Sequence, residues 1–462
     1  MLTYNFENRD GVSLYDYLYR CIKSDILDGR LMSNEKLPSK RSLAQHLNLS
    51  VITVMNAYTQ LITEGYIYAV EKRGYFVRSI EKQTVSAKMP QQIEKVPEKH
   101  EYFMDFKTNS IKADYFPFSV WSKLMREVLL EQDTRLLHPA PYNGVALLRE
   151  AIADHLYHFR GMSVNAEQIV VGAGTEYLYN LIIQLLGRDN ILAIENPGYH
   201  KISKIYDVNN VHYEYVNIDE HGMSVKELEN SQANIIHISP SHHYPTGIVT
   251  SIGRRHQLLQ WANESENRYI IEDDYDSEFR FAGRPIQPLQ SIDMNEKVIF
   301  INTFSKSMAP SIRISYMVLP PHLLKKYRSN LGFYSCTVPS FEQYTLAKFI
   351  TGGYFERHIN KTKKLYRAQR DKIISEINNS SFHDRVTVLG ENAGLHFLLK
   401  IKTDKSDAEI ITLAAEKNIG LSCLSEYLNK PDKRHEHFVV VNYSGIDCGR
   451  LEETIMRLET LL

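Results

Sequence analysis

The sequence Thr303-Phe304-Ser305-Lys306-Ser307-Met308-Ala309-Pro310-Ser311-Ile312-Arg313 follows an apolar run at residues 298–301 that is typical of a buried strand. A lysine becomes a Schiff-base nucleophile when its amine is partly desolvated or crowded by other cations, and the end of a strand can place Lys306 in that way. The hydroxyl groups and the forked donors of Arg313 are suited to holding a phosphate beside it. Taken alone, the stretch fits both a lysine that bonds a phosphate-bearing cofactor and an exposed lysine in a Ser-rich loop.

The composition is that of a multidomain globular protein. The chain has 462 residues, too many for one ordinary core, so we expect two or three domains. Hydrophobic residues make up 43% and charged residues 24%. The formal net charge is -1, so any contact with nucleic acid must come from a local basic patch.

Cysteine usage and the N-terminus favour a reducing cytoplasm. Four cysteines lie far apart and show neither metal-ligand nor redox spacing, so we predict free thiols and no metal site. The first residues lack the basic and apolar regions of a signal peptide. No apolar run approaches the length of a membrane span, and we therefore expect a cytoplasmic protein without a membrane partner.

Residues 1–80 follow the element order of a winged helix-turn-helix. Leu14, Leu18, Ile22 and Ile26 recur at helical spacing, and further helices are predicted at 42–47 and 51–64. Two strands, at 66–70 and 75–77, flank the turn 71–74 and predict a hairpin. In such a module the last helix enters the major groove of DNA. A small helical interaction domain with a hairpin is the alternative that this pattern leaves open.

Polar and basic residues stand at the positions of this module that would meet DNA. We expect contacts to phosphates just before and at the second helix, to bases from the start of the third helix, and to the phosphates or minor groove from the wing. The corresponding residues are Lys40 and Arg41; Ser50, Thr53 and Asn56; and Arg73 and Gly74. Ten basic and eight acidic residues give this segment a net charge of only +2, which permits DNA binding without requiring it.

The same segment resembles the DNA-binding domain of GntR-family regulators over nearly all of residues 12–78. The resemblance rests on the sequence Leu-Pro-Ser-Lys-Arg-Ser-Leu-Ala at 37–44, on Thr53-Val54, and on the run at 57–66. Many members of that family carry an arginine just after the serine that opens the recognition helix, whereas this sequence has Val51 there. The family's contact at this position, beside Ser50 and Thr53, is therefore missing or replaced here. Residues 81–104 are polar and interrupted by prolines, and we interpret them as a linker.

Residues 105–462 alternate strands with helices, which is the pattern of an α/β fold with a mainly parallel sheet covered by helices. Apolar runs at 169–171, 191–194, 235–238, 269–271 and 298–301 each lead into a marked turn. In sheets of this kind, ligands bind at the carboxyl ends of the strands. The lysine stretch and the four other turns are therefore predicted to meet at one edge.

These turns carry the parts of a pyridoxal-phosphate site. Gly174 and Thr175 open a helix whose backbone N–H groups can hold a phosphate. Asp273 ends a buried strand, and a carboxylate there can keep a pyridinium nitrogen protonated. Tyr275 is suited to bonding the phenolic oxygen of the ring, and Tyr199 to stacking on its face. Each residue alone also fits a role in packing or capping, but five successive strand ends that supply one cofactor site are a specific signal.

With these motifs, residues 105–462 resemble a fold-type I aminotransferase, and the whole chain resembles the MocR/GabR subfamily of GntR-family regulators. The sequences Ser-His-His-Tyr-Pro-Thr-Gly at 241–247 and Glu-Asp-Asp-Tyr-Asp-Ser-Glu-Phe-Arg at 272–280 match two further hallmarks. The resemblance implies that Lys306 forms the internal aldimine with pyridoxal 5′-phosphate, that Asp273 pairs with the ring nitrogen and Tyr275 with the 3′ oxygen, and that Tyr199 stacks on the ring. It assigns the phosphate to Gly174, Thr175, Thr303, Ser305 and Arg313. It also implies a head-to-tail homodimer.

Two positions depart from true aminotransferases. Those enzymes grip the substrate carboxylate with an arginine near the C-terminus, and Val440 stands at that position here. Tyr244 replaces the asparagine of the usual Asn-Pro-Thr-Gly turn, and we count it with the cofactor-binding residues. The loss of a bidentate clamp should cost an amino-acid substrate a charge-assisted contact. Arg434 and Lys201 are candidate substitutes that the sequence does not place.

Three hypotheses follow. The first is a transcriptional regulator that binds double-stranded operator DNA and whose aminotransferase-like domain senses pyridoxal phosphate, an amine or amino-acid effector, or both. The second is a working aminotransferase that carries a DNA-binding domain, against which Val440 argues. The third is a repressor whose second domain binds no cofactor, against which the complete set around Lys306 argues. We favour the first and do not expect steady transamination.

Overall fold

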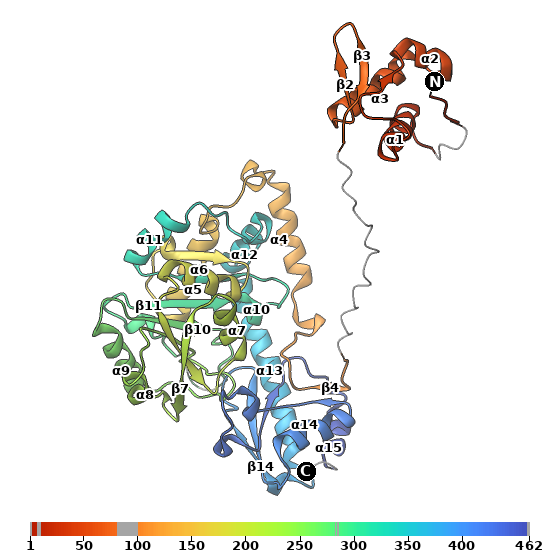
Figure 1. The fold of residues 1–462 in the computed structure, drawn as a ribbon. Helices are drawn as coiled ribbons and strands as arrows, with labels where there is room; N and C mark the ends of the chain where they lie inside the picture. Colours follow the sequence, from red (N-terminus) through yellow and green to blue (C-terminus); the bar gives the residue numbers. More distant parts are fainter. Residues whose placement is uncertain (1, 7–10, 81–99, 282, 284–285, 460–462) are drawn as a thin grey trace. The chain divides into compact units, whose positions relative to one another are not determined.

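The computed structural model describes residues 2–6, 11–80, 100–281, 283 and 286–459. The chain divides into two compact units, Met1–Glu98 and Lys99–Leu462, and each is considered by itself (Figure 1). Residues 81–99 of the expected linker at 81–104 lie outside the described residues. Its last residue, Met104, already belongs to a strand of the second unit, β4 (Met104–Asp105).

The first unit is a winged helix-turn-helix, as expected. Its helices are α1 (Leu14–Leu27), α2 (Lys40–Leu47) and α3 (Val51–Thr63), and its sheet of β1 (Lys36–Leu37), β2 (Ile67–Val70) and β3 (Gly74–Val77) has the order β1-β3-β2. Gly74 lies in β3 and not in the turn where the sequence placed it. The apolar side chains that recur at helical spacing meet in one core that includes Leu18, Ile22, Leu43, Val54 and Leu61.

Serine caps determine where the last two helices begin. Ser39 Oγ accepts a hydrogen bond from the backbone N–H of Ser42, which starts α2 two residues before the expected position. Ser50 Oγ accepts one from the N–H of Thr53 at 3.0 Å and opens α3. Between them Asn48 ends α2 in the left-handed region with φ 56°, which asparagine tolerates better than most residues. This short turn fixes the angle at which α3 leaves α2.

The second unit is built on an eight-stranded sheet with the order β5-β12-β11-β10-β9-β6-β7-β8. The strands are β5 (Ile169–Gly172), β6 (Ile191–Asn196), β7 (His212–Asp219), β8 (Gly222–Met223), β9 (Ile235–Ile238), β10 (Tyr269–Asp274), β11 (Val298–Thr303) and β12 (Ser315–Val318). Pairing is parallel from β7 through β6, β9 and β10 to β11, and antiparallel where β12 and β8 join. β5 pairs antiparallel with β12, so it again runs in the direction of β11.

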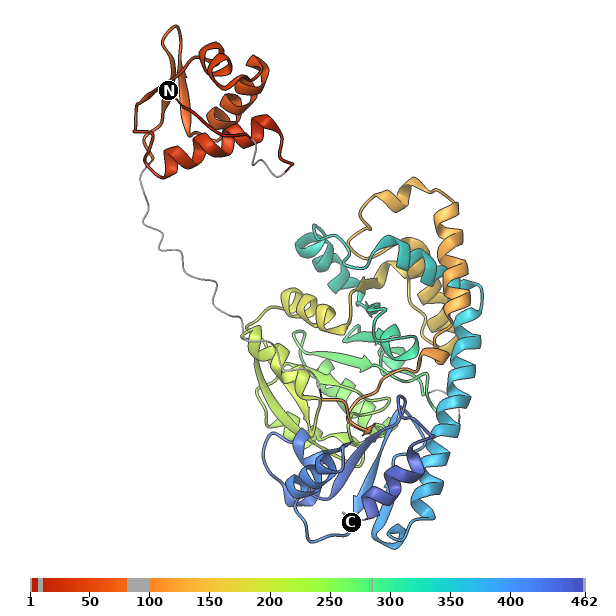
Figure 2. The same ribbon diagram turned by 90° about the vertical axis from the view of Figure 1, so that its right-hand side faces the viewer.

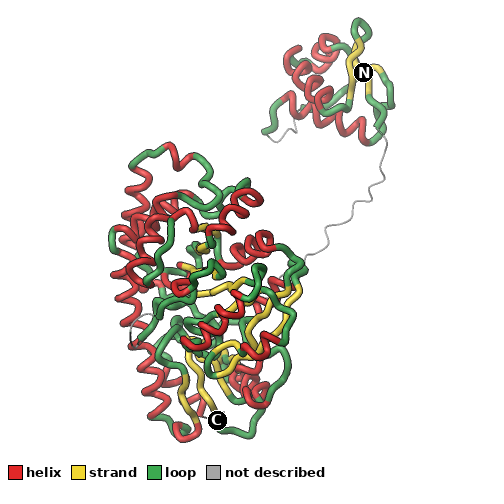
Figure 3. Tube along the Cα trace, turned by 90° about the vertical axis from the view of Figure 1, so that its left-hand side faces the viewer, coloured by secondary structure: helices red, strands yellow, loops and turns green. Residues whose placement is uncertain are grey.

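Helices cover both faces of this sheet, which explains the continuous apolar runs in its strands. Successive residues point to opposite sides: Ile299 packs in one core with α6 (Thr175–Leu186) and α11 (Pro321–Leu331), and Phe300 in another with α5 (Ala146–Arg160) and α12 (Ser340–Thr351). Figure 3 shows strands of the second unit between helices. Full burial of such a side chain stabilises the fold by about 1.5–3 kcal/mol.

A 25-residue helix, α13 (Tyr354–Asn378), joins the large sheet to a smaller one. It is roughly 37 Å long at the α-helical rise per residue, and Figure 2 shows it along one side of the second unit. The smaller sheet has the order β13-β14-β17-β16, formed by β13 (Val386–Leu389), β14 (His396–Ile401), β17 (Phe438–Asn442) and β16 (Ser422–Cys423). Near it, β4 pairs parallel with β15 (Ile419–Gly420).

The remaining α-helices of the described chain are α4 (Phe118–Leu130), α7 (His200–Val208), α8 (Val225–Glu229), α9 (Ile252–Asn263), α10 (Phe304–Ser307), α14 (Asp407–Glu416) and α15 (Leu451–Glu459). Within the described part of the chain, no helix has the length and apolar character needed to cross a membrane.

Replacement of Ser50 by alanine should weaken the start of α3. Loss of a serine N-cap costs about 1 kcal/mol, so amide exchange in residues 51–63 should become roughly fivefold faster. Hydrogen–deuterium exchange with peptide mass spectrometry measures this, and peptides from the second unit serve as the internal reference. Ser50→Asp, which keeps a capping oxygen, should exchange like the wild type. Equal exchange in wild type and Ser50→Ala would show that the cap contributes nothing.

Candidate functional site

A cavity of about 390 Å³ lies where the parallel strands end at their carboxyl termini. Nine of the ten residues that the sequence assigned to cofactor binding line it. They are Thr175, Tyr199, Tyr244, Asp273, Tyr275, Thr303, Ser305, Lys306 and Arg313. The tenth, Gly174, is the N-cap residue of α6 with φ 93°, and a Cβ at this position would overlap the guanidinium of Arg313. The five strand ends therefore do converge, as the alternation of strands and helices predicted.

Lys306 lies on α10, the single short turn of helix that follows β11. Burial lowers the pKa of its amine, because the charged form loses hydration. A larger fraction of the amine is therefore neutral and nucleophilic at a given pH than for a lysine in water. The local sequence left both a desolvated and an exposed Lys306 open, and the structure places Lys306 in the lining of the cavity.

Asp273 is held with one carboxylate oxygen free. The hydroxyl of Tyr179, on α6, donates to Asp273 Oδ2, and His237 Nε2 lies 3.7 Å from the same oxygen. Burial raises the pKa of Tyr179 well above its usual value, so it stays a hydroxyl and a donor. Asp273 Oδ1 is buried without a hydrogen-bond partner among the described residues. A buried carboxylate oxygen without a partner is costly unless a donor fills the cavity beside it.

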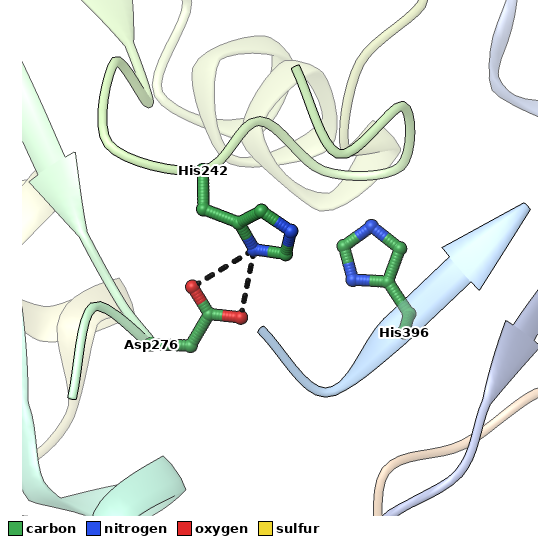
Figure 4. Close-up of side chains that lie close together, drawn as sticks. All are labelled: His242, Asp276 and His396. Carbon is green, nitrogen blue, oxygen red and sulfur yellow. Dashed lines mark hydrogen bonds and ion pairs between the residues drawn. The ribbon is translucent and has the colours of Figure 1, made fainter. Parts of the chain in front are cut away.

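Tyr275 is positioned by a histidine–carboxylate pair, drawn in Figure 4. His242 Nδ1 lies 3.0 and 3.1 Å from the two carboxylate oxygens of Asp276 and 3.3 Å from the hydroxyl oxygen of Tyr275. The carboxylate can only accept, so Nδ1 must carry the proton. The Tyr275 oxygen then accepts from the same N–H, and its own O–H is left to point into the cavity. Burial raises the pKa of Tyr275 well above its usual value and keeps that proton in place.

His396, at the start of β14, lies beside this pair with its ring centroid 4.7 Å from that of His242 (Figure 4). One donor atom from each of His242, Asp276 and His396 lies within 4.8 Å of the others, a spacing that would also suit a metal ion. Burial lowers the pKa of His396 well below its usual value. Because His242 Nδ1 is already committed to Asp276, we interpret the group as support for Tyr275.

Donors for a phosphate gather at one end of the cavity. Ser305 Oγ is buried without a hydrogen-bond partner in the described chain, whereas Thr303 Oγ1 accepts from the backbone N–H of Ser305 at 3.1 Å and from Ser315 Oγ at 2.8 Å. Arg313 has φ 52°, an uncommon backbone conformation for arginine, and its guanidinium donates to the carboxylate of Glu176. Lys201 Nζ donates to the same carboxylate.

Aromatic side chains also line the cavity. The ring of Tyr199 meets that of Tyr244 at 5.7 Å in an edge-to-face arrangement. The Tyr244 hydroxyl lies 3.0 Å from that of Tyr427. Tyr199 is half exposed at the start of α7, so one ring face is open to a planar partner.

No guanidinium occupies the position of the expected carboxylate clamp. Val440 is fully buried in an apolar cluster with Leu398 and Leu424, against which Tyr244 and Tyr427 pack. Of the two candidate substitutes, Arg434 is exposed and pairs with Asp432 at 2.7 Å, outside the lining of the cavity. Lys201 lines the cavity but is paired with Glu176.

Glu195 and His243 form a buried neutral pair beside the cavity. Glu195 Oε2 lies 3.5 Å from His243 Nε2 and accepts from the backbone N–H of Ser239 at 3.0 Å. Burial raises the pKa of Glu195 to about 8 and lowers that of His243 to about 3. At neutral pH the carboxyl group is therefore mainly protonated and the imidazole uncharged, so the contact is not an ion pair.

Several cavity residues carry no signal in the sequence. Tyr179, Glu176 and His237 lie inside helices or a strand, where side chains of their kind are common without any role in binding. Only their convergence on Asp273 or Arg313 distinguishes them.

In the first unit, cations without carboxylate partners lie on the α2 and wing side. Acidic residues neutralise the cations of α1: Arg20 pairs with Asp16, and Lys23 with Glu64. Among the described residues, no ion pair forms at the cations that the sequence assigned to DNA or at their neighbour on the wing, namely Lys40, Arg41, Lys72 and Arg73. The α2 and wing side is therefore more positively charged than the small net charge of residues 1–80 suggests.

The start of α3 presents both polar and apolar groups. Ser50 Oγ and Thr53 Oγ1 lie 2.8 Å apart and bond to each other, and Asn56 is exposed. Val51 is 45% exposed, Ile52 64% and Met55 39%. This face of the helix therefore offers methyl groups beside its polar side chains.

Two family models match the sequence. The model described as "Aminotransferase class I and II" matches residues 102–435. The model described as "Bacterial regulatory proteins, gntR family" matches residues 14–77. The two matches lie in the second and first compact units, respectively.

Relatives match along nearly the whole chain. The HTH-type transcriptional regulator YdeL of Bacillus subtilis (strain 168) is 36% identical over 98% of each chain. The probable rhizopine catabolism regulatory protein MocR of Rhizobium meliloti is 28% identical over 98% of this chain and 94% of its own. The kynurenine aminotransferase of Pyrococcus horikoshii shares the fold, with a TM-score of 0.68 at 23% identity, over 79% of this chain and 91% of that chain.

From the raised pKa of Glu195 we predict how the free energy of unfolding depends on pH. The ordinary pKa of a glutamate is 4.5, and that of Glu195 in the folded chain is about 8. Between these two pH values the folded chain keeps a proton on Glu195 that the unfolded chain releases. The contribution of Glu195 to the free energy of unfolding therefore falls as the pH rises. Glu195→Gln removes the titration and should gain stability relative to wild type from about pH 5 to about pH 8. Urea unfolding followed by the fluorescence of Trp121 and Trp261, both in the second unit, measures the difference. Glu150→Gln, at an exposed position on α5, is the matched control, and parallel pH profiles for wild type and Glu195→Gln would contradict the assignment.

Proposed function

The chain belongs to the MocR/GabR subfamily of GntR-family transcriptional regulators, and on this premise we propose that it senses pyridoxal 5′-phosphate through Lys306. Its first unit is a GntR-type helix-turn-helix domain and its second an aminotransferase-like domain. In the proposed function, occupancy of the second unit controls how the first binds operator DNA.

One observation carries the proposal: Lys306, whose amine has its pKa lowered by burial, lines the same cavity as Asp273, whose Oδ1 has no hydrogen-bond partner among the described residues. The cofactor suits both, since its aldehyde reacts with an amine and its ring nitrogen donates to a carboxylate when protonated. Ser305 Oγ and Arg313 would hold its phosphate, Tyr275 its phenolic oxygen, and Tyr199 its ring face. The match of each unpartnered group to a cofactor atom supports the assignment.

The chemistry at Lys306 is a condensation. Pyridoxal phosphate, when bound, would supply an aldehyde that can condense with the neutral amine of Lys306 with loss of water. The bound cofactor supplies an electron-accepting ring. The protein's contribution is to lower the pKa of Lys306 by burial, to hold Asp273 through Tyr179, and to direct the Tyr275 proton through His242 and Asp276.

For DNA, the unpaired cations support the assignment of Lys40, Arg41 and Arg73 to backbone phosphates, and Gly74 lets the chain approach closely in the wing. Asn56 is free to meet a base edge, while Ser50 and Thr53 are engaged in the cap. The exposed Ile52 and Met55 suit the methyl group of thymine, which offers an apolar surface in the major groove.

Val440 favours a sensor over a catalyst. An amino acid bound through the cofactor would find an apolar cluster where a carboxylate clamp is expected. The effector is therefore the cofactor itself or an amine without an α-carboxylate. An active aminotransferase that carries a DNA-binding domain is the second candidate, and it is favoured by the complete cofactor set around Lys306.

The coupling to DNA requires a ligand that binds one arrangement of the chain better than another. We propose a head-to-tail homodimer in the cytoplasm, in which cofactor binding changes the spacing of the two DNA-binding units. The polar segment that the sequence analysis interprets as a linker would connect the two units whose spacing changes.

Purified protein mixed with pyridoxal phosphate should gain a visible absorbance band that Lys306→Ala lacks. The band arises from the C=N bond to Lys306, and the variant has no amine at that position. Operator binding, followed by fluorescence anisotropy, should respond to pyridoxal phosphate in the wild type and not in Lys306→Ala. Lys204→Ala, on α7 outside the cavity lining, is the control and should match the wild type.

An unchanged spectrum in Lys306→Ala would remove Lys306 from the site. Brisk turnover of amino acids to keto acids by the wild type would establish the aminotransferase in place of the sensor.

Arg41→Ala should weaken operator binding and lower the salt dependence of log K by about 1, as expected for the loss of one phosphate contact. Arg20→Ala removes a cation of the same unit that pairs with Asp16 at 2.8 Å, and it should change neither quantity. Anisotropy titrations at several salt concentrations measure both. An Arg41→Ala protein with wild-type affinity and slope would show that Arg41 meets no phosphate.

A further inference from the structure

One carboxylate, Glu176, occupies the cationic end of the cavity. It lies in the first turn of α6, and its two oxygens accept from Lys201 on α7 and from Arg313 after α10. It therefore joins side chains that are 25 and 137 residues distant in the sequence. Glu176 Oε2 would come within 2.9 Å of a Cβ on Gly174, so the carboxylate folds back over the N-cap of its own helix.

The environment keeps Glu176 ionised. Burial raises its pKa, but hydrogen bonds from Lys201, Arg313 and its own backbone N–H outweigh that effect and lower the pKa to about 2. At neutral pH the cationic end therefore already contains an anion. This anion has the same partners that a phosphate would use, namely an arginine and the N–H groups at a helix start.

A phosphate in this position would meet Glu176 as a like charge. A phosphate monoester carries about -1.5 to -2 charges at pH 7, and it would need the Arg313 donors that Glu176 now holds. Ser305 Oγ, which has no partner in the described chain, is available to phosphate without any exchange. Arg313 is not, because its guanidinium already donates to the carboxylate of Glu176.

We propose that Glu176 sets the affinity of the site, because its carboxylate competes with the phosphate of the cofactor for Arg313 and Lys201. The inference rests on the proposed function, since it assumes that pyridoxal phosphate binds at Lys306. Each binding event must break the ion pairs of Glu176 before the phosphate forms its own. Affinity is thereby held low enough for occupancy to follow the cofactor concentration, which suits a sensor and would be a disadvantage in a permanently loaded enzyme.

If Glu176 competes for Arg313 and Lys201, it should affect only ligands that carry a phosphate. Pyridoxal has the same aldehyde and ring but no phosphate, so its binding at Lys306 leaves the ion pairs of Glu176 intact. A change at Glu176 should therefore act on pyridoxal phosphate and spare pyridoxal. A carboxylate that only shaped the cavity would act on both.

The test is a titration of wild-type and Glu176→Gln protein with pyridoxal phosphate and, separately, with pyridoxal, followed by the Lys306-dependent absorbance. Glu176→Gln should lower the dissociation constant of pyridoxal phosphate roughly tenfold, which is the size of effect expected for one close charge interaction in a half-exposed site. Its affinity for pyridoxal should change less than about twofold. Glu176→Asp keeps the charge and should stay closer to wild type than Glu176→Gln does.

Glu167→Gln is the matched control. Glu167 also bridges two arginines, Arg149 at 2.7 Å and Arg328 at 2.6 Å, but it lies outside the cavity lining. It should leave both affinities unchanged. Thermal unfolding of each variant, with a folded baseline at the titration temperature, separates a change in affinity from a loss of fold.

Weaker or unchanged binding of pyridoxal phosphate by Glu176→Gln would overturn the inference and make Glu176 a residue that positions Arg313. An equal gain for pyridoxal would also overturn it. These outcomes differ from a failure of the proposed function, in which the wild type shows no Lys306-dependent absorbance with either compound.

Discussion

The parallel alignment of β5, β6, β9, β10 and β11 is the constraint on which the second unit depends. All five run in one direction, so the turns that follow them meet at one edge of the sheet. The insertion of β12 between β5 and β11 brings the N-terminus of α6 to the side of the lysine turn. Because β5 runs parallel to β11 across β12, Gly174 and Arg313 come into contact.

The electrostatics of the cavity follow from burial and from the donors that the sheet brings together. Asp273 receives a hydroxyl from Tyr179 on one oxygen and keeps the other free, while Lys306 is held towards its neutral form. Burial raises the pKa of both Glu195 and Glu176, but hydrogen bonds from Lys201 and Arg313 outweigh that effect at Glu176 and lower its pKa below the usual value. Two carboxyl groups on one cavity thus take opposite protonation states at neutral pH.

In the proposed site, one end would hold the cofactor, and Val440 marks the end where a substrate carboxylate would lie. An intact lysine, aspartate and tyrosine set would serve a catalyst as well as a sensor. Val440 and its apolar neighbours occupy the place of the carboxylate clamp, and the paired Lys201 and the distant Arg434 do not replace it. With a helix-turn-helix unit in the same chain, a site that binds cofactor without gripping an amino acid is suited to regulation.

The sequence by itself determined the winged helix-turn-helix, the alternation of strands and helices, and the residues around Lys306. Strand runs, helical spacing, serine caps and glycine turns are local patterns, and each is written within a dozen or so residues. The tertiary structure alone decided which side chains meet across the chain. Tyr179 reaches Asp273 over 94 residues and Arg313 reaches Glu176 over 137, and nothing local marks either pair. Ionisation was likewise beyond the sequence, because the burial and the partners that fix the pKa of Lys306, Glu176 and Glu195 exist only after the sheet has brought its strand ends together.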